Sequence, residues 1–218
     1  MMINRRARGS AAAVVMLAVA SVAANQAEAS AVGFGASWQM NEKSGAVVDS
    51  SGNGNNGTVH GGVTRTGSGY RFDGRTGYVT VPNSPSLNPG AGDISITVGF
   101  SLAGNPRSGE DYDLVRKGLA GTRGGDYRME VLDKGRAFCR FGGSNAAATL
   151  TGGTNLGVGT HTVSCVKTSN KIALYVDSVS KDTKTVTIGT MSNSEPVILA
   201  AKPGDDFTNG LIDYIKIT

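Results

Sequence analysis

The stretch Ile94-Ser-Ile-Thr-Val-Gly-Phe-Ser-Leu102 decides the fold class of this chain. Its large apolar residues occupy every second position: Ile94, Ile96, Val98, Phe100 and Leu102. Successive side chains of a β-strand point to opposite faces, so a period of two predicts a strand with one buried face. The same period recurs in residues 171–177, 185–189 and 211–217.

Turn-forming residues separate these apolar runs along the whole chain. The 218 residues include 32 glycines, many of them in Ser-Gly, Asn-Gly, Gly-Gly and Asp-Gly pairs that favour turns. No window beyond residue 29 shows the apolar stripe of an amphipathic helix. The pattern predicts an all-β fold, an antiparallel β-sandwich of the jelly-roll type. Residues 103–126 are polar and rich in glycine, so we expect a long exposed loop there.

The first 29 residues differ in character from the rest. Arg5, Arg6 and Arg8 precede an apolar run too short to span a bilayer with certainty, and Ala27-Glu28-Ala29 is typical of a cleavage site. We expect residues 1–29 to be a signal peptide and residues 30–218 to be a single secreted, extracellular domain, with no membrane span in the mature chain.

The charge balance of the mature chain argues against nucleic acid as a partner. Removing the leader, with three arginines and one glutamate, leaves 18 basic and 16 acidic residues, a net charge of +2. No run of like charges and no basic patch interleaved with aromatic residues remains.

Two cysteines, Cys139 and Cys165, are the only ones in the chain. An even count in an exported protein predicts a disulfide between them. Both lie in runs that read as strands, 136–141 and 161–166, and neighbouring strands bring Cα atoms within bonding reach. We therefore expect the two cysteines on strands that are adjacent or nearly so.

Several motifs in a fixed order resemble one family. They are Trp38-Gln-Met-Asn-Glu42, Val48–Thr58, Tyr70-Arg-Phe-Asp-Gly74, Gly77–Pro82, Ile172–Asp177 and Asn209–Ile217. Together they resemble laminin-G-like, concanavalin-A-like lectin/glucanase jelly-roll domains. The cysteine pair and the Trp38 motif resemble secreted actinobacterial versions. Two positions depart from the family pattern: Thr160 stands where Trp is common, and Ser178 where Gly is common.

The resemblance implies binding functions more readily than catalysis. Glucanases of this fold carry Glu-x-Asp-x-x-Glu, which is missing here; Asp111 and Asp113 have spacing two, but they fall in the expected loop. Arg128-Met-Glu130 is only faintly similar to a lyase motif. We expect no catalytic residues and no enzyme activity, with a glucanase or lyase as the less supported alternative.

The resemblance also implies one structural Ca²⁺ near the first turn, 49–62. In the family, the Asp of this turn and the Asp of a C-terminal strand often meet at such an ion. Asp49 and Asp213 take these positions, with Asn53 and Asn56 as further ligands. The alternative is that Asp49 caps a turn, and that Asp213 accepts backbone N–H groups or pairs with a cation.

The favoured function is a secreted, non-catalytic domain that binds carbohydrate or cell-surface glycans. Sugar sites combine aromatic and polar side chains, and four residues within 107–128 offer both: Tyr112, Arg123, Tyr127 and Arg128. With Arg107, Arg116 and Lys117 they would form a basic rim suited to acidic glycans. The alternative partner is an extracellular or envelope protein, in an interaction or structural role.

Overall fold

Alternating side chains of β6 (Ile94–Leu102) fill the space between two sheets, as its sequence predicts. All five of its alternate apolar residues are buried. From the opposite sheet, β8 (Asp126–Leu132) contributes Tyr127, Met129 and Val131, each 1% exposed or less. Each fully buried side chain of this kind contributes about 1.5–3 kcal/mol, so the two strands anchor the core.

The computed structural model describes residues 1, 33–153, 155–156, 159–202 and 204–218. The expected signal peptide, residues 1–29, therefore lies outside the described residues except for Met1. Residues Val32–Thr218 form one compact unit. Its described helices are 3₁₀ turns at Pro85–Leu87 and Asp133–Gly135, and none has the length and apolar character needed to cross a bilayer.

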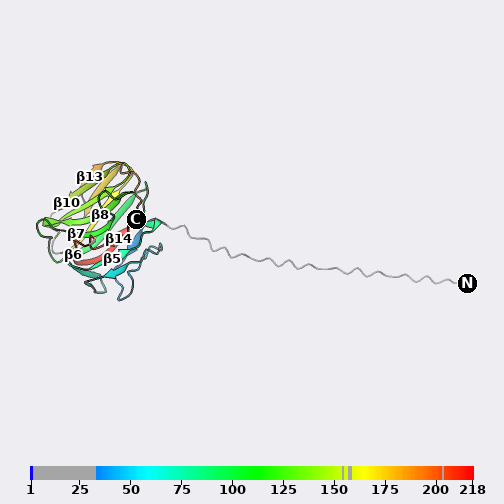
Figure 1. Cartoon of the computed structure of the whole chain (residues 1–218), viewed down its shortest axis with the longest axis horizontal. Coiled ribbons are helices and arrows are strands. Elements are labelled where there is room, and N and C mark those ends of the chain that lie inside the picture. Colours follow the sequence, from blue (N-terminus) through cyan, green and yellow to red (C-terminus); the bar gives the residue numbers. More distant parts are fainter. Residues whose placement is uncertain (2–32, 154, 157–158, 203) are drawn as a thin grey trace. The chain divides into compact units, whose positions relative to one another are not determined.

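Two antiparallel sheets form the sandwich (Figure 1). The eight-stranded sheet has the order β13-β12-β11-β6-β15-β4-β3, with β1 also paired to β15. Its strands are β1 (Ala36–Trp38), β3 (Val63–Arg65), β4 (Tyr70–Asp73), β6, β11 (Thr160–Lys167), β12 (Lys171–Val176), β13 (Val179–Thr185) and β15 (Asn209–Ile217). This confirms the all-β jelly-roll prediction.

The seven-stranded sheet has the order β10-β9-β8-β7-β14-β5-β2. Its strands are β2 (Thr58–His60), β5 (Tyr78–Val81), β7 (Asp111–Lys117), β8, β9 (Arg136–Gly142), β10 (Ala147–Gly152) and β14 (Val197–Leu199). One face of this sheet packs on the core. The other face, which we call the outer face, carries the charged residues discussed below.

The predicted disulfide between Cys139 and Cys165 is present, with a Cα–Cα distance of 6.3 Å. The expectation of strands that are adjacent or nearly so was wrong, because Cys139 lies on β9 and Cys165 on β11 of the other sheet. Both side chains point into the core, where the two sheets face each other, and so the bond joins the two layers of the sandwich.

The expectation of an exposed loop over 103–126 was also wrong in its central part. Strand β7 (Asp111–Lys117) lies there, between β8 and β14. Asp113, Arg116 and Lys117 are each 2% exposed or less. Asp113 and Arg116 compensate each other's charges, and oxygen atoms of the loops surround the charge of Lys117. Hydropathy alone predicts that charged residues are exposed, and so the strand was not expected.

Candidate functional site

A network of buried charges lies on the outer face of the seven-stranded sheet. Arg116 donates from Nε to Asp113 Oδ1 at 2.9 Å and from Nη2 to Asp113 Oδ2 at 2.6 Å. Its Nη2 also donates to Glu130 Oε1 at 2.9 Å, and Arg128 Nη1 lies 3.0 Å from the same oxygen. Successive residues of a strand point to opposite faces. Because Tyr127 points into the core, Arg128 and Glu130 point to the outer face.

Burial dominates the protonation of these acids. It raises the pKa of Glu130 to about 8, and the nearby Asp113 charge acts in the same direction. It also raises the pKa of Asp113 to about 6, against the opposing hydrogen bonds from Arg116. Both carboxyl groups therefore favour the protonated form more strongly than in water, because a buried charge is poorly solvated.

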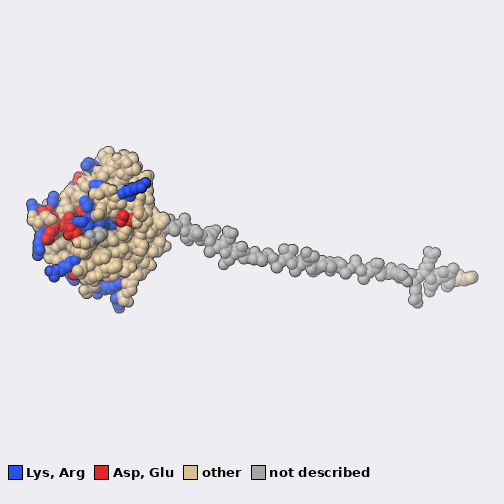
Figure 2. Space-filling model, viewed as in Figure 1, with Lys and Arg blue, Asp and Glu red and all other residues tan. Residues whose placement is uncertain are grey.

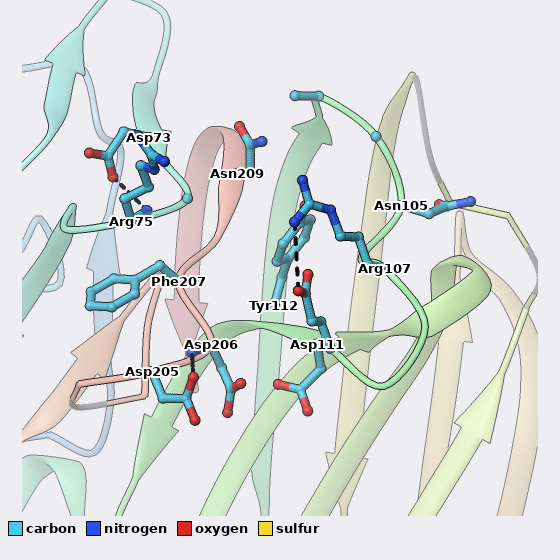
Figure 3. A pocket seen from close by; sticks show the side chains of 14 residues that line it. Asp73, Arg75, Asn105, Arg107, Asp111, Tyr112, Asp205, Asp206, Phe207 and Asn209 are labelled. Atoms are coloured by element: carbon cyan, nitrogen blue, oxygen red, sulfur yellow. Dashed lines mark hydrogen bonds and ion pairs between the residues drawn. The ribbon is translucent and has the colours of Figure 1, made fainter.

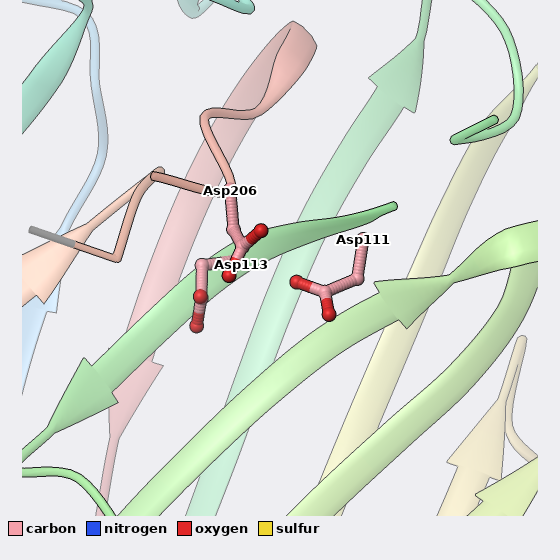
Figure 4. Close-up of side chains that lie close together, drawn as sticks. All are labelled: Asp111, Asp113 and Asp206. Carbon is pink, nitrogen blue, oxygen red and sulfur yellow. The ribbon is translucent and has the colours of Figure 1, made fainter. Parts of the chain in front are cut away.

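Asp111, Asp113 and Asp206 bring three carboxyl groups together at one end of this network (Figure 4). One oxygen of each lies within 4.8 Å of the others. Burial, followed by repulsion from Asp206, raises the pKa of Asp111. Hard cations accept such oxygen ligands, but Arg116 pairs with Asp113, and Lys202 Nζ lies 2.7 Å from Asp206 Oδ2. Two of the three carboxylates, Asp113 and Asp206, are thus already paired with cations, and Asp111 is not paired among the described residues.

An open pocket of ≈ 530 Å³ borders this cluster (Figure 3). Two loops, one turn and the adjoining ends of β7 and β15 line it: Asp73–Arg75, Ala103–Asn105, Arg107, Glu110–Tyr112, Asp205–Phe207 and Asn209. We call it the rim pocket. In Figure 3, Tyr112 and Asp111 lie across the pocket from Phe207 and Arg75. Carboxylates, amides and guanidinium groups thus share one hollow with two aromatic side chains.

Phe207 belongs to a short row of aromatic rings. The His60 and Tyr78 rings, paired across β2 and β5, stack at 4.6 Å between centroids. The Phe207 ring lies 6.4 Å from that of Tyr78 at an angle of 55°. All three residues are only partly buried. The row therefore extends the aromatic wall of the rim pocket over the outer face.

The four expected ligand residues do not form one site. Tyr112 lines the rim pocket, and Arg123 is exposed outside it. Tyr127 is 1% exposed and donates its hydroxyl to the Leu87 carbonyl at 3.2 Å, so its expected place on a ligand rim was wrong. Arg128 is bound to Glu130 and lies over the Phe138 ring, 5.2 Å from its centroid. The alternation in β8 turns Tyr127 into the core and Arg128 onto the outer face.

The structure does not bring the expected calcium ligands together. Asp49 pairs with Trp38 in β1, and Trp38 pairs in turn with Ile215 of β15. Strand β1 therefore separates Asp49 from β15, where Asp213 lies at a register shift. Within the described part of the chain, the Asp213 side chain makes no hydrogen bond. Burial raises the pKa of its carboxyl group.

Asp49 instead caps a turn, the alternative left open by the sequence. Its Oδ1 accepts the backbone N–H groups of Ser37 and Ser51, each at 2.9 Å, and its Oδ2 accepts that of Asn55 at 2.9 Å. Although burial opposes them, these donors lower the pKa of Asp49.

The two asparagines expected beside it are also engaged. Asn56 Oδ1 accepts the Asp49 N–H at 2.8 Å, and Asn53 Nδ2 donates to the Gly35 carbonyl at 2.8 Å. A cation between Asp49 and Asn56 would face N–H donors, so these residues do not fit the expected ion.

Comparison with known proteins identifies the family. The profile of the family described as the Concanavalin A-like lectin/glucanases superfamily matches residues 72–218, two thirds of the chain. The chain belongs to this superfamily. A search of curated protein sequences found no significant match.

Solved structures share the fold of this superfamily member at low sequence identity. The binding domain of botulinum neurotoxin DC, in complex with SialylT, is 15% identical, with a TM-score of 0.67 over 84% of this chain. The binding domain of Paraclostridial Mosquitocidal Protein 1 is 16% identical, with a TM-score of 0.65 over 84% of this chain. The present chain covers 47% and 48% of these two chains, about half their length.

The sequence pointed to only part of the rim pocket of this superfamily member. Asp111 stands out in the sequence by its spacing of two from Asp113, and Tyr112 by its basic neighbours. No local pattern marks Asp73, Asp206 or Phe207. They reach the pocket because the β4–β5 turn and the β14–β15 loop end at the same edge of the sandwich.

The raised pKa of Glu130 predicts a pH dependence of stability. The folded state holds a proton that the unfolded chain releases above about pH 4.5. This stabilisation is complete below pH 4.5 and is lost as the pH rises through about 8. We expect urea unfolding to show lower stability at pH 8 than at pH 5, and Glu130→Gln to reduce the difference.

The exposed Glu110 supplies a matched control, since Glu110→Gln should keep the pH dependence of the wild type. Asp113 adds to the effect in the same direction, while the lowered pKa of Asp49 acts only at more acidic pH. An unchanged pH dependence in Glu130→Gln would contradict the assignment.

Proposed function

We propose that this chain is a non-catalytic domain that binds glycans in the rim pocket. The observation that carries the proposal is the composition of the pocket wall. Carboxylates and amides of Asp111, Asp206 and Asn209 can accept and donate hydrogen bonds to sugar hydroxyls, and the rings of Tyr112 and Phe207 offer apolar surface to a sugar ring. Pockets of this kind orient small polar ligands by a few polar groups on a partly aromatic wall.

The charge of the pocket wall selects against acidic glycans. Five carboxyl groups line the pocket, from Asp73, Glu110, Asp111, Asp205 and Asp206. They outnumber the guanidinium groups of Arg75 and Arg107 in the wall and the ammonium group of Lys202, which pairs with Asp205 and Asp206. Two members of the basic rim expected from the sequence, Arg116 and Lys117, are buried and already bound to oxygen atoms. The ligand class is therefore an uncharged or amine-bearing glycan, which the acidic wall does not repel.

Buried carboxyl groups of the outer face are unsuited to glycoside hydrolysis. Asp113 and Glu130 are 0% and 3% exposed, and Arg116 binds both of them. A glycosidase needs two carboxyl groups that flank an accessible glycosidic bond. This favours binding over catalysis. Release of new reducing ends from a bound polysaccharide would overturn this part of the proposal.

A glycan fits the surface better than a protein partner does. The exposed large apolar residues of the described domain, Val48, Leu119 and Val179, lie in separate segments. Protein interfaces need clustered apolar or aromatic anchors. Among the similar structures, the binding domain of botulinum neurotoxin DC is described in complex with rat synaptotagmin II and in complex with SialylT. Either kind of partner is compatible with the fold, and the polar pocket favours the glycan.

The disulfide between Cys139 and Cys165 supports action outside the cell. Such bonds persist in oxidising compartments and are rare where thiols are kept reduced. We therefore include an extracellular location in the proposal.

Replacing Phe207 by alanine should weaken glycan binding. We expect isothermal titration with soluble xylan, mixed-linkage glucan and chitosan to detect binding of at least one of them. Loss of the aromatic wall should raise its Kd by about 10-fold, which corresponds to about 1.4 kcal/mol.

Tyr175→Ala is the matched control, because Tyr175 is a partly exposed aromatic residue on β12 of the other sheet. Equal losses of glycan affinity in Phe207→Ala and Tyr175→Ala would contradict the assignment of the binding site to the rim pocket. Polygalacturonate should bind less well than the uncharged polymers.

A further inference from the structure

A second pocket lies at the opposite ends of the strands that lead to the rim pocket. It measures ≈ 430 Å³, and the ends of β8 and β9, the β9–β10 hairpin and neighbouring loops line it. We call it the hairpin pocket. Arg140 Nε lies 2.7 Å from Asp126 Oδ1 in its wall, and these side chains are 17% and 3% exposed.

The hairpin pocket combines polar groups with apolar surface, and its charged lining residues carry no net charge. Asp126 and Arg140 compensate each other, and the other side chains include Ser144, Asn145 and Thr190. Five glycines bring backbone N–H and C=O groups to the wall. At Gly142 a Cβ atom would lie 2.4 Å from an Asp126 carboxylate oxygen, so a side chain there would disturb the ion pair. Hydroxyl groups of an uncharged sugar suit such a wall.

Strand register places the two pockets at the two ends of one sheet face. Asp111, in the rim pocket, pairs with Leu132 at the end of β8, and Asp126, in the hairpin pocket, begins β8. Seven residues of a strand span about 20 Å. A chain of contacts runs between the pockets, from Asp113 through Arg116 and Glu130 to Arg128.

The surface between the pockets suits a sugar chain. Arg128 lies over the Phe138 ring and keeps 23% of its side chain exposed, and Phe138 is only partly buried. Arg128 pairs across the strands with Arg140, which lines the hairpin pocket. Figure 2 shows charged side chains of both signs gathered in a band over β7 and β8 (compare Figure 1). Polar groups and one aromatic ring thus lie along the path.

We propose that the hairpin pocket is a second glycan subsite, and that one extended uncharged or amine-bearing glycan occupies both pockets by crossing Arg128 and Phe138. This inference rests on the proposed function of the rim pocket. A disaccharide is too short to reach from one pocket to the other. When a longer glycan is bound in one pocket, its contact with the second pocket becomes intramolecular. This strengthens overall binding without a higher affinity in either pocket.

The test compares short and long forms of the same sugars by isothermal titration. The probes are the disaccharide and hexasaccharide of cellulose, of xylan and of chitosan. We expect a hexasaccharide to bind at least 10-fold more tightly than its disaccharide. Ala147→Trp, which places an indole in the hairpin pocket from an exposed position of β10, should remove this gain and leave disaccharide binding in the rim pocket unchanged.

Thr183→Trp is the matched control, since Thr183 is an exposed strand residue of β13, at the edge of the other sheet. It should bind the hexasaccharide as the wild type does. Asn145→Trp, at an exposed hairpin position in the same pocket, is a second blocking variant if Ala147→Trp does not fold.

The outcomes separate the two proposals. If Phe207→Ala weakens hexasaccharide binding and both blocking variants leave it unchanged, the second subsite is wrong and the rim pocket stands. The second subsite is also wrong if disaccharide and hexasaccharide bind equally well. Failure of every probe to bind the wild type would overturn the proposed function, and this inference with it.

Discussion

Replacing Asp113 by alanine should lower the free energy of unfolding by about 3–5 kcal/mol, the usual cost of removing one partner from a buried ion pair. Asp113 is 0% exposed and accepts two hydrogen bonds from Arg116, which is itself 2% exposed. Without Asp113, the guanidinium group keeps only Glu130 as a charged partner in the buried network. Urea unfolding at pH 8, where Asp113 is mostly ionised, measures the loss directly.

Two variants make this measurement specific. Asp113→Asn keeps an acceptor for Arg116 and should cost less than Asp113→Ala. Asp205 is an exposed carboxylate near Lys202, and Asp205→Ala should unfold within error of the wild type. A loss below about 1 kcal/mol in Asp113→Ala, within the range of exposed pairs, would show that the network does not hold β7 to β8.

Removal of the disulfide should have an effect of similar size. The bond between Cys139 and Cys165 closes a loop with a sequence separation of 26. The chain-entropy relation predicts a loss of about 3–4 kcal/mol in the double variant Cys139→Ala/Cys165→Ala. For a domain of this size, the midpoint of thermal unfolding should fall by about 6–16 °C. Alanine is preferred to serine because both sites are fully buried and a hydroxyl group there would lack a partner.

Reduction provides the matched control for this variant. A reductant added during unfolding should destabilise the wild type to the level of the double variant and leave the double variant unchanged. Equal stability of the two proteins without reductant would mean that packing alone joins β9 to β11.

The period-two pattern predicted much of the fold because it depends only on the local geometry of a strand. Ile94 to Leu102 alternate in sequence and are buried in the structure as expected. The same rule, applied to β8, separates Tyr127, Met129 and Val131 from Asp126, Arg128 and Glu130. Tyr127 was placed on a ligand rim because its charged neighbours were weighed more heavily than this alternation.

Buried charges account for the main error in the fold. Residues 111–117 contain four charged side chains, so their composition is typical of a loop. Their partners, Glu130 on β8 and the loop oxygens around Lys117, lie far away in sequence. No local pattern shows that a charge will be compensated, and therefore the strand was missed.

The sequence by itself determined the fold class, the strands of the core and the pairing of the two cysteines, because alternation and an even cysteine count need no knowledge of neighbours. Only the tertiary structure decided which strands lie side by side. It placed β1 between Asp49 and β15, and it set Asp206 and Phe207 against Asp111 at one edge of the sandwich. Such contacts depend on how distant segments pack around a shared core, and the residues of one segment alone do not specify that packing.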